Sequence, residues 1–309
     1  VTLYPCLAMD IAAGNGLPDP WGGAEQAAFP WRGRITCDPA PGRPGTADRT
    51  AAARTQIAAF VGTIPVSAFA VSGTQGVCSR PDEWSYRRMI LHMAHLAVAA
   101  GGVDAFLIGS ELVGLGRLRD ATGAHPFVEA LVALAADVRT VLGPSTTLTY
   151  GADWSEWFGH HPDDGSGDVI FHLDPLWASP AIDVVGIDAW FPLTDWRPGP
   201  HLDAALADRP TDRDHLDARI AGGENYDWYY ASEADRLAQI RTPIADAAHG
   251  EDWVFRPKDL LGWWSNPHHD RPARVRSPTP TAWVPGSKPI WLTELGCPAV
   301  DLGSNDPAA

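Results

Sequence analysis

The segment Val103-Asp104-Ala105-Phe106-Leu107-Ile108-Gly109-Ser110-Glu111 is an apolar run that ends in a carboxylate. A second run of the same kind, Pro289-Ile290-Trp291-Leu292-Thr293-Glu294-Leu295-Gly296, lies near the end of the chain. Short apolar runs bounded by glycine and polar residues are typical of strands buried in a parallel sheet. We therefore expect two strands that present Glu111 and Glu294 at their carboxyl ends. In a barrel of parallel strands, that end carries the active site.

Strand-like and helix-like segments alternate along the rest of the chain. We predict further strands at residues 1–11, 146–152 and 182–189. We predict helices at residues 51–60, 82–100 and 124–142, and the last two have apolar residues at helical spacing. The alternation of strands and helices predicts a parallel sheet and therefore an α/β fold.

This pattern yields about five barrel strands, whereas a complete (β/α)8 barrel has eight. We therefore expect one incomplete TIM-barrel-like domain over residues 1–309, whose missing strands would lie before Val1 and after Ala309. Such a fragment would expose two sheet edges with unpaired backbone groups, and either the missing chain or a partner would have to cover them.

Two long segments interrupt the alternation of strands and helices. Residues 12–50 are rich in proline and glycine, and they predict a long loop over the barrel mouth. Residues 192–288 form a large insertion before the last strand, with helical pieces near 229–240 and 258–264.

The composition narrows the classes of function. A net charge of −15 disfavours nucleic acid and anionic membranes as partners, because both bind basic surfaces. No apolar run is long enough to span a bilayer, and the first residues lack the features of a signal peptide. The 14 Trp residues favour sugar binding weakly, since indole rings stack on sugar rings. The four cysteines have no zinc or disulfide spacing, so we expect reduced packing residues and no cofactor.

A pair of carboxylates facing each other across a cleft is the usual equipment for cleaving a glycosidic bond. A retaining mechanism needs the two carboxyl groups about 5–5.5 Å apart. The alternative for each glutamate is a solvated residue at a strand end or one half of an ion pair. The matching positions of Glu111 and Glu294 favour the glycosidase site.

Other polar and aromatic residues follow the predicted strands and are candidates for binding substrate. Each tryptophan among them could instead pack between loops. Asp10 could instead cap the next turn, and Arg34 could instead pair with a neighbouring acid. The candidates are Asp10, Arg34, Asp153, Trp154, Trp157, Asp188 and Trp190. We predict no metal site, because adjacent residues such as His268-His269-Asp270 and His160-His161 do not easily converge on one ion, and we interpret both as polar rims.

Several longer motifs extend over almost the whole chain. They are Val1-Thr2-Leu3-Tyr4-Pro5, Met9-Asp10-Ile11, Gly22-Gly23-Ala24-Glu25-Gln26, Trp31-Arg32-Gly33-Arg34-Ile35-Thr36-Cys37, Gly109-Ser110-Glu111-Leu112, Gly151-Ala152-Asp153-Trp154-Ser155-Glu156-Trp157, Gly262-Trp263-Trp264-Ser265-Asn266-Pro267-His268-His269-Asp270 and Thr293-Glu294-Leu295-Gly296-Cys297-Pro298-Ala299-Val300-Asp301. These motifs resemble the TIM-barrel-like domain of gene transfer agent and phage-tail baseplate (host specificity) proteins.

The resemblance has implications for fold and chemistry. Members of that family are similar to clan A glycoside hydrolases, in which the fourth strand ends in the acid/base glutamate and the seventh in the nucleophile. It therefore implies that Glu111 is the acid/base, that Glu294 is the nucleophile, and that the family's first two strands and its eighth are absent. Clan A enzymes usually have asparagine before the acid/base, where it holds the sugar 2-hydroxyl. This chain has Ser110, a shorter residue with one hydroxyl donor.

The expected function is that of a retaining glycoside hydrolase-like domain in a baseplate protein of a gene transfer agent or phage-like tail. It would be made in the bacterial cytoplasm, assemble with other tail proteins, and act on peptidoglycan or another envelope polysaccharide of the recipient cell during attachment or DNA delivery. The alternative is a non-catalytic glycan-binding or structural tail domain on an inherited barrel. Ser110 favours this alternative, and the retained glutamates favour the enzyme. A free secreted glycosidase is a third, weaker possibility.

Overall fold

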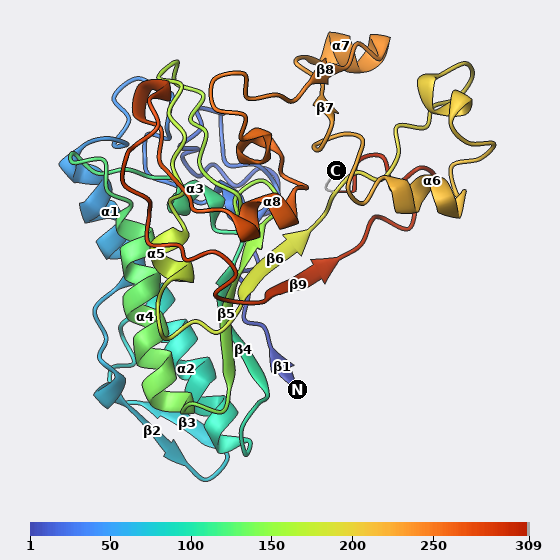
Figure 1. Cartoon of the computed structure of the whole chain (residues 1–309). Coiled ribbons are helices and arrows are strands. Elements are labelled where there is room, and N and C mark those ends of the chain that lie inside the picture. The colour runs from blue at the N-terminus through green and yellow to red at the C-terminus, as the bar shows by residue number, and fades with distance from the viewer. Residues whose placement is uncertain (308–309) are drawn as a thin grey trace.

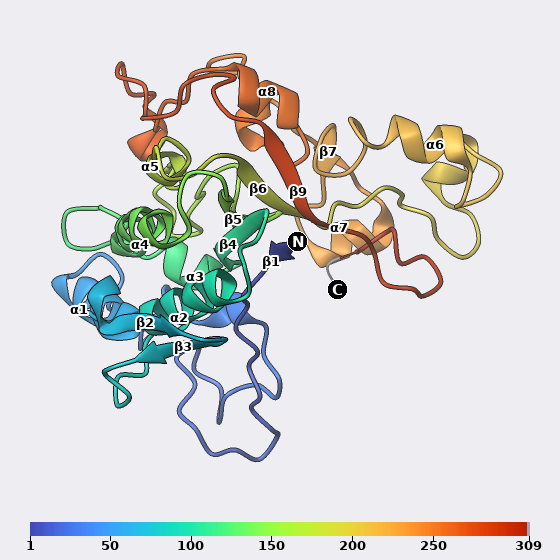
Figure 2. The same cartoon turned by 90° about the horizontal axis from the view of Figure 1, so that it is seen from below.

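A five-stranded parallel sheet forms the centre of the protein, in a computed structural model that describes residues 1–307. The sheet curls into half of a barrel (Figure 2). Its strands follow one another in chain order from edge to edge, as β1 (Thr2–Leu3), β4 (Ala105–Ser110), β5 (Thr147–Asp153), β6 (Val185–Ala189) and β9 (Ile290–Leu295). These are the five predicted strands, so the expectation of an incomplete α/β, TIM-barrel-like fold is confirmed.

The predicted helices are present and pack together on one side of the sheet (Figure 1). They are α1 (Ala51–Val61), α2 (Tyr86–Ala99) and α4 (Pro126–Leu142), and the short helices α3 (Val113–Gly116) and α5 (Asp174–Trp177) lie in the connections. Strand residues such as Phe106 and Leu148 share a continuous apolar core with helix residues such as Ile90 and Leu131. Burial of these apolar faces is the main force that holds the helices on the sheet.

Two predicted boundaries were wrong for identifiable reasons. The strand expected at residues 1–11 pairs with β4 only at Thr2 and Leu3. Pro5 has no N–H to donate to a sheet, and the chain continues from there as a loop. Helix α2 begins four residues later than expected, because Ser85 provides the cap by accepting a hydrogen bond from the Arg88 N–H.

Two small antiparallel strand pairs were not predicted from the sequence. β2 (Phe69–Ser72) and β3 (Gln75–Cys78) pair antiparallel through a tight turn in which Gly73 has φ of 60°. Such a turn favours glycine, and this was the available signal. β7 (Trp228–Tyr229) and β8 (Thr242–Pro243) form the second antiparallel pair.

The insertion 192–288 consists of short elements. Its helices are α6 (Arg213–Ala218), α7 (Glu233–Ala238) and α8 (Leu260–Ser265), and the last two fall within or beside the predicted helical pieces. The part that carries α6, α7, β7 and β8 extends away from the sheet, in yellow and orange in Figure 1.

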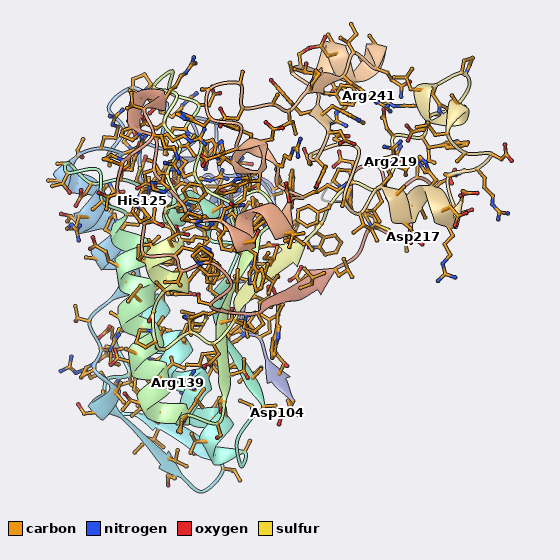
Figure 3. The ribbon with its side chains drawn as sticks, viewed as in Figure 1. Asp104, His125, Arg139, Asp217, Arg219 and Arg241 are labelled. Atoms are coloured by element: carbon orange, nitrogen blue, oxygen red, sulfur yellow. The ribbon has the colours of Figure 1, made fainter. Side chains whose placement is uncertain are left out.

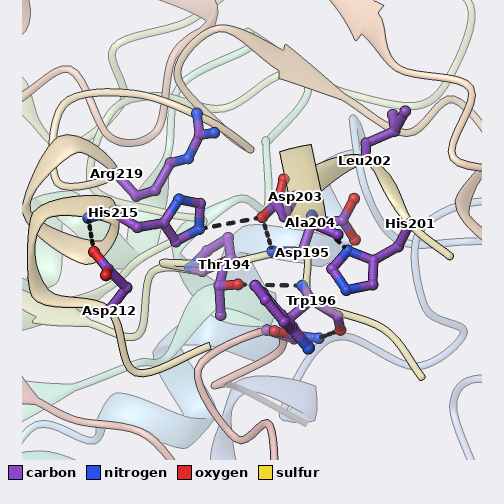
Figure 4. Close-up of polar contacts among 12 residues, drawn as sticks. Thr194, Asp195, Trp196, His201, Leu202, Asp203, Ala204, Asp212, His215 and Arg219 are labelled. Carbon is purple, nitrogen blue, oxygen red and sulfur yellow. Dashed lines mark hydrogen bonds and ion pairs between the residues drawn. The ribbon is translucent and has the colours of Figure 1, made fainter. Parts of the chain in front are cut away.

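Charged contacts hold this extended part of the insertion. Arg241 lies 2.9 Å from Asp195 and 2.8 Å from Asp203. The His215 ring faces Asp203 at 3.3 Å, as Figure 4 shows. Lys258 is buried and donates to the carbonyl oxygens of three residues of the insertion or its start, Pro192, Arg219 and Gly222.

Ion pairs also fasten the amino ends of the strands. Arg139 of α4 pairs with Asp183, just before β6, and donates to the carbonyls of Gly143, Thr146 and Ala181. Figure 3 shows Arg139 and Asp104 at this end, away from the carboxyl ends of the strands. Residues at the amino face of such a sheet serve stability, whereas chemistry is carried at the opposite face.

Several polar residues differ from their predicted environments. His268 was expected on a polar rim, but it is fully buried among aromatic rings, and its ring lies 2.9 Å from Asp174. His160 is also buried. All four cysteines are free, as expected, yet Cys6 and Cys297 are exposed rather than packed. Among the described residues, no helix combines the length and apolar character needed to cross a membrane.

Candidate active site

The backbone at the end of β4 is bent so that Glu111 points into the mouth of the half-barrel. The pairing of β4 with β5 shifts register between Leu107 and Ser110, and Glu111 has a left-handed φ of 49°. Such a conformation costs a non-glycine residue about 1–3 kcal/mol and is concentrated at functional sites. Gly109 permits the bend, because a Cβ there would lie 1.8 Å from the Tyr86 hydroxyl.

Glu111 is held through one of its two carboxylate oxygens. The Trp31 indole N–H donates to Oε2 at 2.5 Å, and the Arg32 guanidinium lies 3.0 Å from the same oxygen. Within residues 1–307, no group makes a hydrogen bond to Oε1. Burial raises the pKa of Glu111, the contacts with Trp31 and Arg32 oppose this rise, and the charges of Asp153 and Glu294 add to it.

Glu294 is held through both of its oxygens. The Tyr4 hydroxyl lies 3.0 Å from Oε1, and the Trp190 indole N–H donates to Oε2 at 2.9 Å. Arg32 approaches Oε1 at 3.6 Å, so one guanidinium contacts both glutamates. The orientation of Glu294 is therefore fixed from three directions.

Asp188 is a third carboxylate at the same point. It is fully buried at the end of β6, where Thr293 donates to Oδ1 at 2.6 Å and the Tyr4 hydroxyl lies 2.8 Å from Oδ2. Burial raises the pKa of Asp188 to about 7, and the nearby charges of Glu294 and Glu111 contribute to the rise. One oxygen from each of Glu111, Asp188 and Glu294 lies within 4.8 Å of the others, a spacing at which they could share a metal ion. Arg32 already supplies a positive charge between the two glutamates.

Ser110 does not face the substrate side of the site. It is buried, and its hydroxyl and carbonyl oxygens accept hydrogen bonds from Nε of Arg32 at 3.0 and 3.2 Å. The side chain expected to stand in for a sugar-binding asparagine instead anchors the arginine that contacts Glu111 and Glu294.

A cavity of about 640 Å³ opens above the two glutamates. Its lining combines aromatic, acidic and proline side chains, namely Trp31, Glu111, Asp153, Trp154, Ser155, Trp190, Glu294, Cys297, Pro298 and Pro307. Four predicted site residues besides Glu111 and Glu294 therefore lie in or next to this cavity. Asp153, Trp154 and Trp190 line the cavity, whereas Asp188 lies buried beneath it.

Three predicted substrate contacts lie elsewhere. Trp157 is buried, donates to the Pro257 carbonyl and packs on Trp263, so it belongs to the core. Arg34 stacks on Trp21 and lies 3.8 Å from Asp19, beside a separate small cavity. Asp10 is exposed in a loop and does not line the 640 Å³ cavity.

Four site residues were not predicted from the sequence, namely Tyr4, Trp31, Arg32 and Thr293. Each lies in one of the motifs that carried the resemblance, and that was the only signal available. Trp31 and Arg32 come from the long loop at 12–50, about 80 positions from Glu111 along the chain. Local patterns do not reveal which strand end such a loop approaches.

The overall arrangement is a curled parallel sheet with two glutamates at the carboxyl ends of β4 and β9, which are separated in the sheet by β5 and β6. A search of curated proteins found no match to this chain. The sequence profile of one family, the GTA TIM-barrel-like domain, matches residues 84–309, which include β4, β5, β6 and β9. The chain therefore belongs to the GTA TIM-barrel-like domain family.

Proposed function

We propose that this protein is a retaining glycoside hydrolase that acts on bacterial envelope glycan. The observation that carries the proposal is the approach of Glu111 and Glu294, whose nearest oxygens lie within 4.8 Å at the floor of a cavity with three tryptophans. This spacing is compatible with a retaining pair, whereas inverting pairs stand about 6.5–9.5 Å apart.

The hydrogen bonds support a division of roles between the glutamates. Glu294, oriented through both oxygens, attacks the anomeric carbon and displaces the glycosidic oxygen to form a glycosyl ester. Glu111 donates a proton to that leaving oxygen, then removes a proton from the water that cleaves the ester. Because both donors to Glu111 occupy Oε2, its proton sits on Oε1.

The tryptophans of the cavity would bind the sugar. Trp31, Trp154 and Trp190 offer flat apolar faces that stack on sugar rings. Trp31 and Trp190 also donate to Glu111 and Glu294, so they couple the binding surface to the reacting carboxylates.

Membership of the GTA TIM-barrel-like domain family supports a proposal about where this reaction occurs. We propose that the domain works in the tail of a gene transfer agent or phage-like particle, together with other tail proteins, and cleaves peptidoglycan or a surface polysaccharide of the recipient cell during attachment or DNA delivery.

The test is release of reducing sugar from peptidoglycan and a panel of bacterial polysaccharides by the purified protein. Hydrolysis that Glu294→Gln abolishes is the expected result. Absence of hydrolysis by the wild-type protein on every substrate would contradict the proposal.

One observation favours a second candidate, a glycan-recognition domain without catalysis. The Ser110 hydroxyl accepts a hydrogen bond from Arg32 and does not face the substrate side. A sugar 2-hydroxyl would therefore lack the hydrogen bond that strengthens in the transition state of glycoside hydrolases. Binding of the same glycans without cleavage would identify this function.

A further inference from the structure

The Tyr4 hydroxyl makes two short contacts but has only one proton. It lies 2.8 Å from Oδ2 of Asp188 and 3.0 Å from Oε1 of Glu294. A phenol can donate one hydrogen bond and can accept others, whereas an ionised carboxylate can only accept. Both contacts are hydrogen bonds only if one of the two carboxyl groups carries a proton.

The surroundings decide which group that is. Asp188 is fully buried, and the groups that contact it are the neutral hydroxyls of Tyr4 and Thr293. Glu294 is partly exposed and has Arg32 at 3.6 Å and the Trp190 N–H at 2.9 Å. A buried carboxyl without a cation stays neutral more readily than one beside a guanidinium.

The charges around Asp188 act in the same direction. Glu294 in β9 and Glu111, the residue after β4, both repel a negative charge on Asp188, and Arg32 contacts these two glutamates. Burial together with these charges raises the pKa of Asp188 to about 7.

We propose that Asp188 is a protonated acid in the folded protein near neutral pH, donating from Oδ2 to the Tyr4 oxygen while Tyr4 donates to Glu294. The proton is placed on Oδ2 because Thr293 can itself donate to Oδ1. Asp188 is thus a positioning residue that acts on Glu294 through Tyr4. Its effect on catalysis rests on the proposed function, whereas its protonation does not.

The sign of the pH dependence follows from linkage. The pKa of Asp188 is raised in the folded state, so the folded protein holds a proton that the unfolded chain releases near pH 4. The stability that this group contributes is therefore present at low pH and is lost as pH rises toward about 7. Asp188→Asn keeps a neutral hydrogen-bond donor at this position. Because an amide does not ionise, the variant should not lose this stability as pH rises.

The experiment compares melting temperatures of wild type, Asp188→Asn and Asp188→Ala from about pH 4 to about pH 8. We expect the stability of Asp188→Asn relative to wild type to increase by several degrees as pH rises. The matched control is Asp153→Asn, the same change at the end of the neighbouring strand, where Ser155 rather than Tyr4 is the partner. A relative stability of Asp188→Asn that falls with pH would overturn the proposal, because it would show an ionised aspartate.

Infrared difference spectra provide a second readout that needs no activity. Wild type minus Asp188→Asn should show the carbonyl stretch of a protonated acid at about pH 6, with a changed frequency in Tyr4→Phe. Only a carboxylate signal would contradict the proposal. Stabilisation by Ca²⁺ or Mn²⁺ that disappears in Asp188→Asn would also contradict it, since Asp188 would then be an ionised ligand.

These readouts separate the two proposals. If the protein cleaves no glycan but the infrared and melting results are as expected, the proposed function fails and the protonation stands. If it cleaves glycan, the pH dependence of kcat in Asp188→Asn should lose an ionisation near pH 7, and an unchanged profile would exclude the effect on Glu294.

Discussion

Glu111 and Glu294 are chemically identical, but the protein holds them in opposite ways. The Glu111 side chain is 6% exposed and receives both of its donors on one oxygen. The Glu294 side chain is 28% exposed and receives donors on both oxygens. Under the proposed function this difference matches the two roles. One oxygen of Glu111 has no hydrogen-bond donor and can carry a proton, whereas both oxygens of Glu294 accept hydrogen bonds.

The largest expected effect tests the roles directly. Glu294→Gln should lower kcat by about 10⁴-fold or more, and Glu111→Gln by about 10²–10⁴-fold, since the first removes the nucleophile and the second the acid/base. Both are measured by steady-state hydrolysis.

Rescue with azide distinguishes the two glutamates further, using the smaller variants Glu294→Ala and Glu111→Ala. Azide that replaces Glu294 attacks the sugar directly and gives an inverted glycosyl azide. Azide at Glu111→Ala attacks the glycosyl ester and gives a retained one. The reverse pattern would exchange the assigned roles.

A second test removes the cation that links the pair. Arg32→Gln should lower kcat/KM by roughly 10²-fold, because both glutamates lose a positioning contact. Arg32 holds the pKa of Glu111 down against burial, so its loss should move the alkaline limb of the kcat/KM profile to higher pH.

Arg34→Gln is the matched control for this substitution. Arg34 belongs to the same short turn, but it contacts Asp19 and Trp21 instead of the site. An equal loss in Arg34→Gln would show that the turn, rather than the guanidinium of Arg32, is responsible.

A third test measures how burial outside the cavity changes the pKa of a carboxyl group and, through it, the stability of the protein. Glu156 is fully buried outside the cavity, and burial raises its pKa to about 8. Its folded-state pKa is raised, so the stability it contributes is lost as pH rises from about 4.5 to about 8. We expect Glu156→Gln to flatten the fall in melting temperature over this range and to be more stable than wild type at the alkaline end. If the melting temperatures of Glu156→Gln and wild type change in parallel with pH, the raised pKa of Glu156 is not the cause of the pH dependence.

The smallest effect concerns Ser110. Ser110→Ala removes one hydrogen bond to Arg32, which is worth about 1 kcal/mol, so a several-fold loss of kcat/KM is expected. Ser110→Asn decides between two roles for this position. If Ser110 serves Arg32, the larger amide should displace the guanidinium and lower activity. An increase in activity would instead indicate that this position contacts the sugar.

Much of the scaffold was predictable from local patterns. The apolar runs that end at Glu111 and Glu294 became two strands of the same parallel sheet, β4 and β9, and the helices near α2 and α4 formed within a few residues of their expected limits. Boundaries shifted where a single residue decided them, as at Pro5 and Ser85. The hairpin of β2 and β3 was missed because its strands are short and mostly exposed, which leaves little periodicity.

The sequence by itself determined where the strands lie along the chain and which glutamates end two of them, because hydrophobic periodicity and strand ends are local properties of the chain. Only the tertiary structure decided what surrounds those glutamates. Trp31, Arg32 and Tyr4 reach them from loops and from β1's end, across 80 to 290 positions of chain. The same packing buried Trp157 and turned Ser110 toward Arg32. Contacts between distant segments depend on how the whole core packs, so no local pattern encodes them.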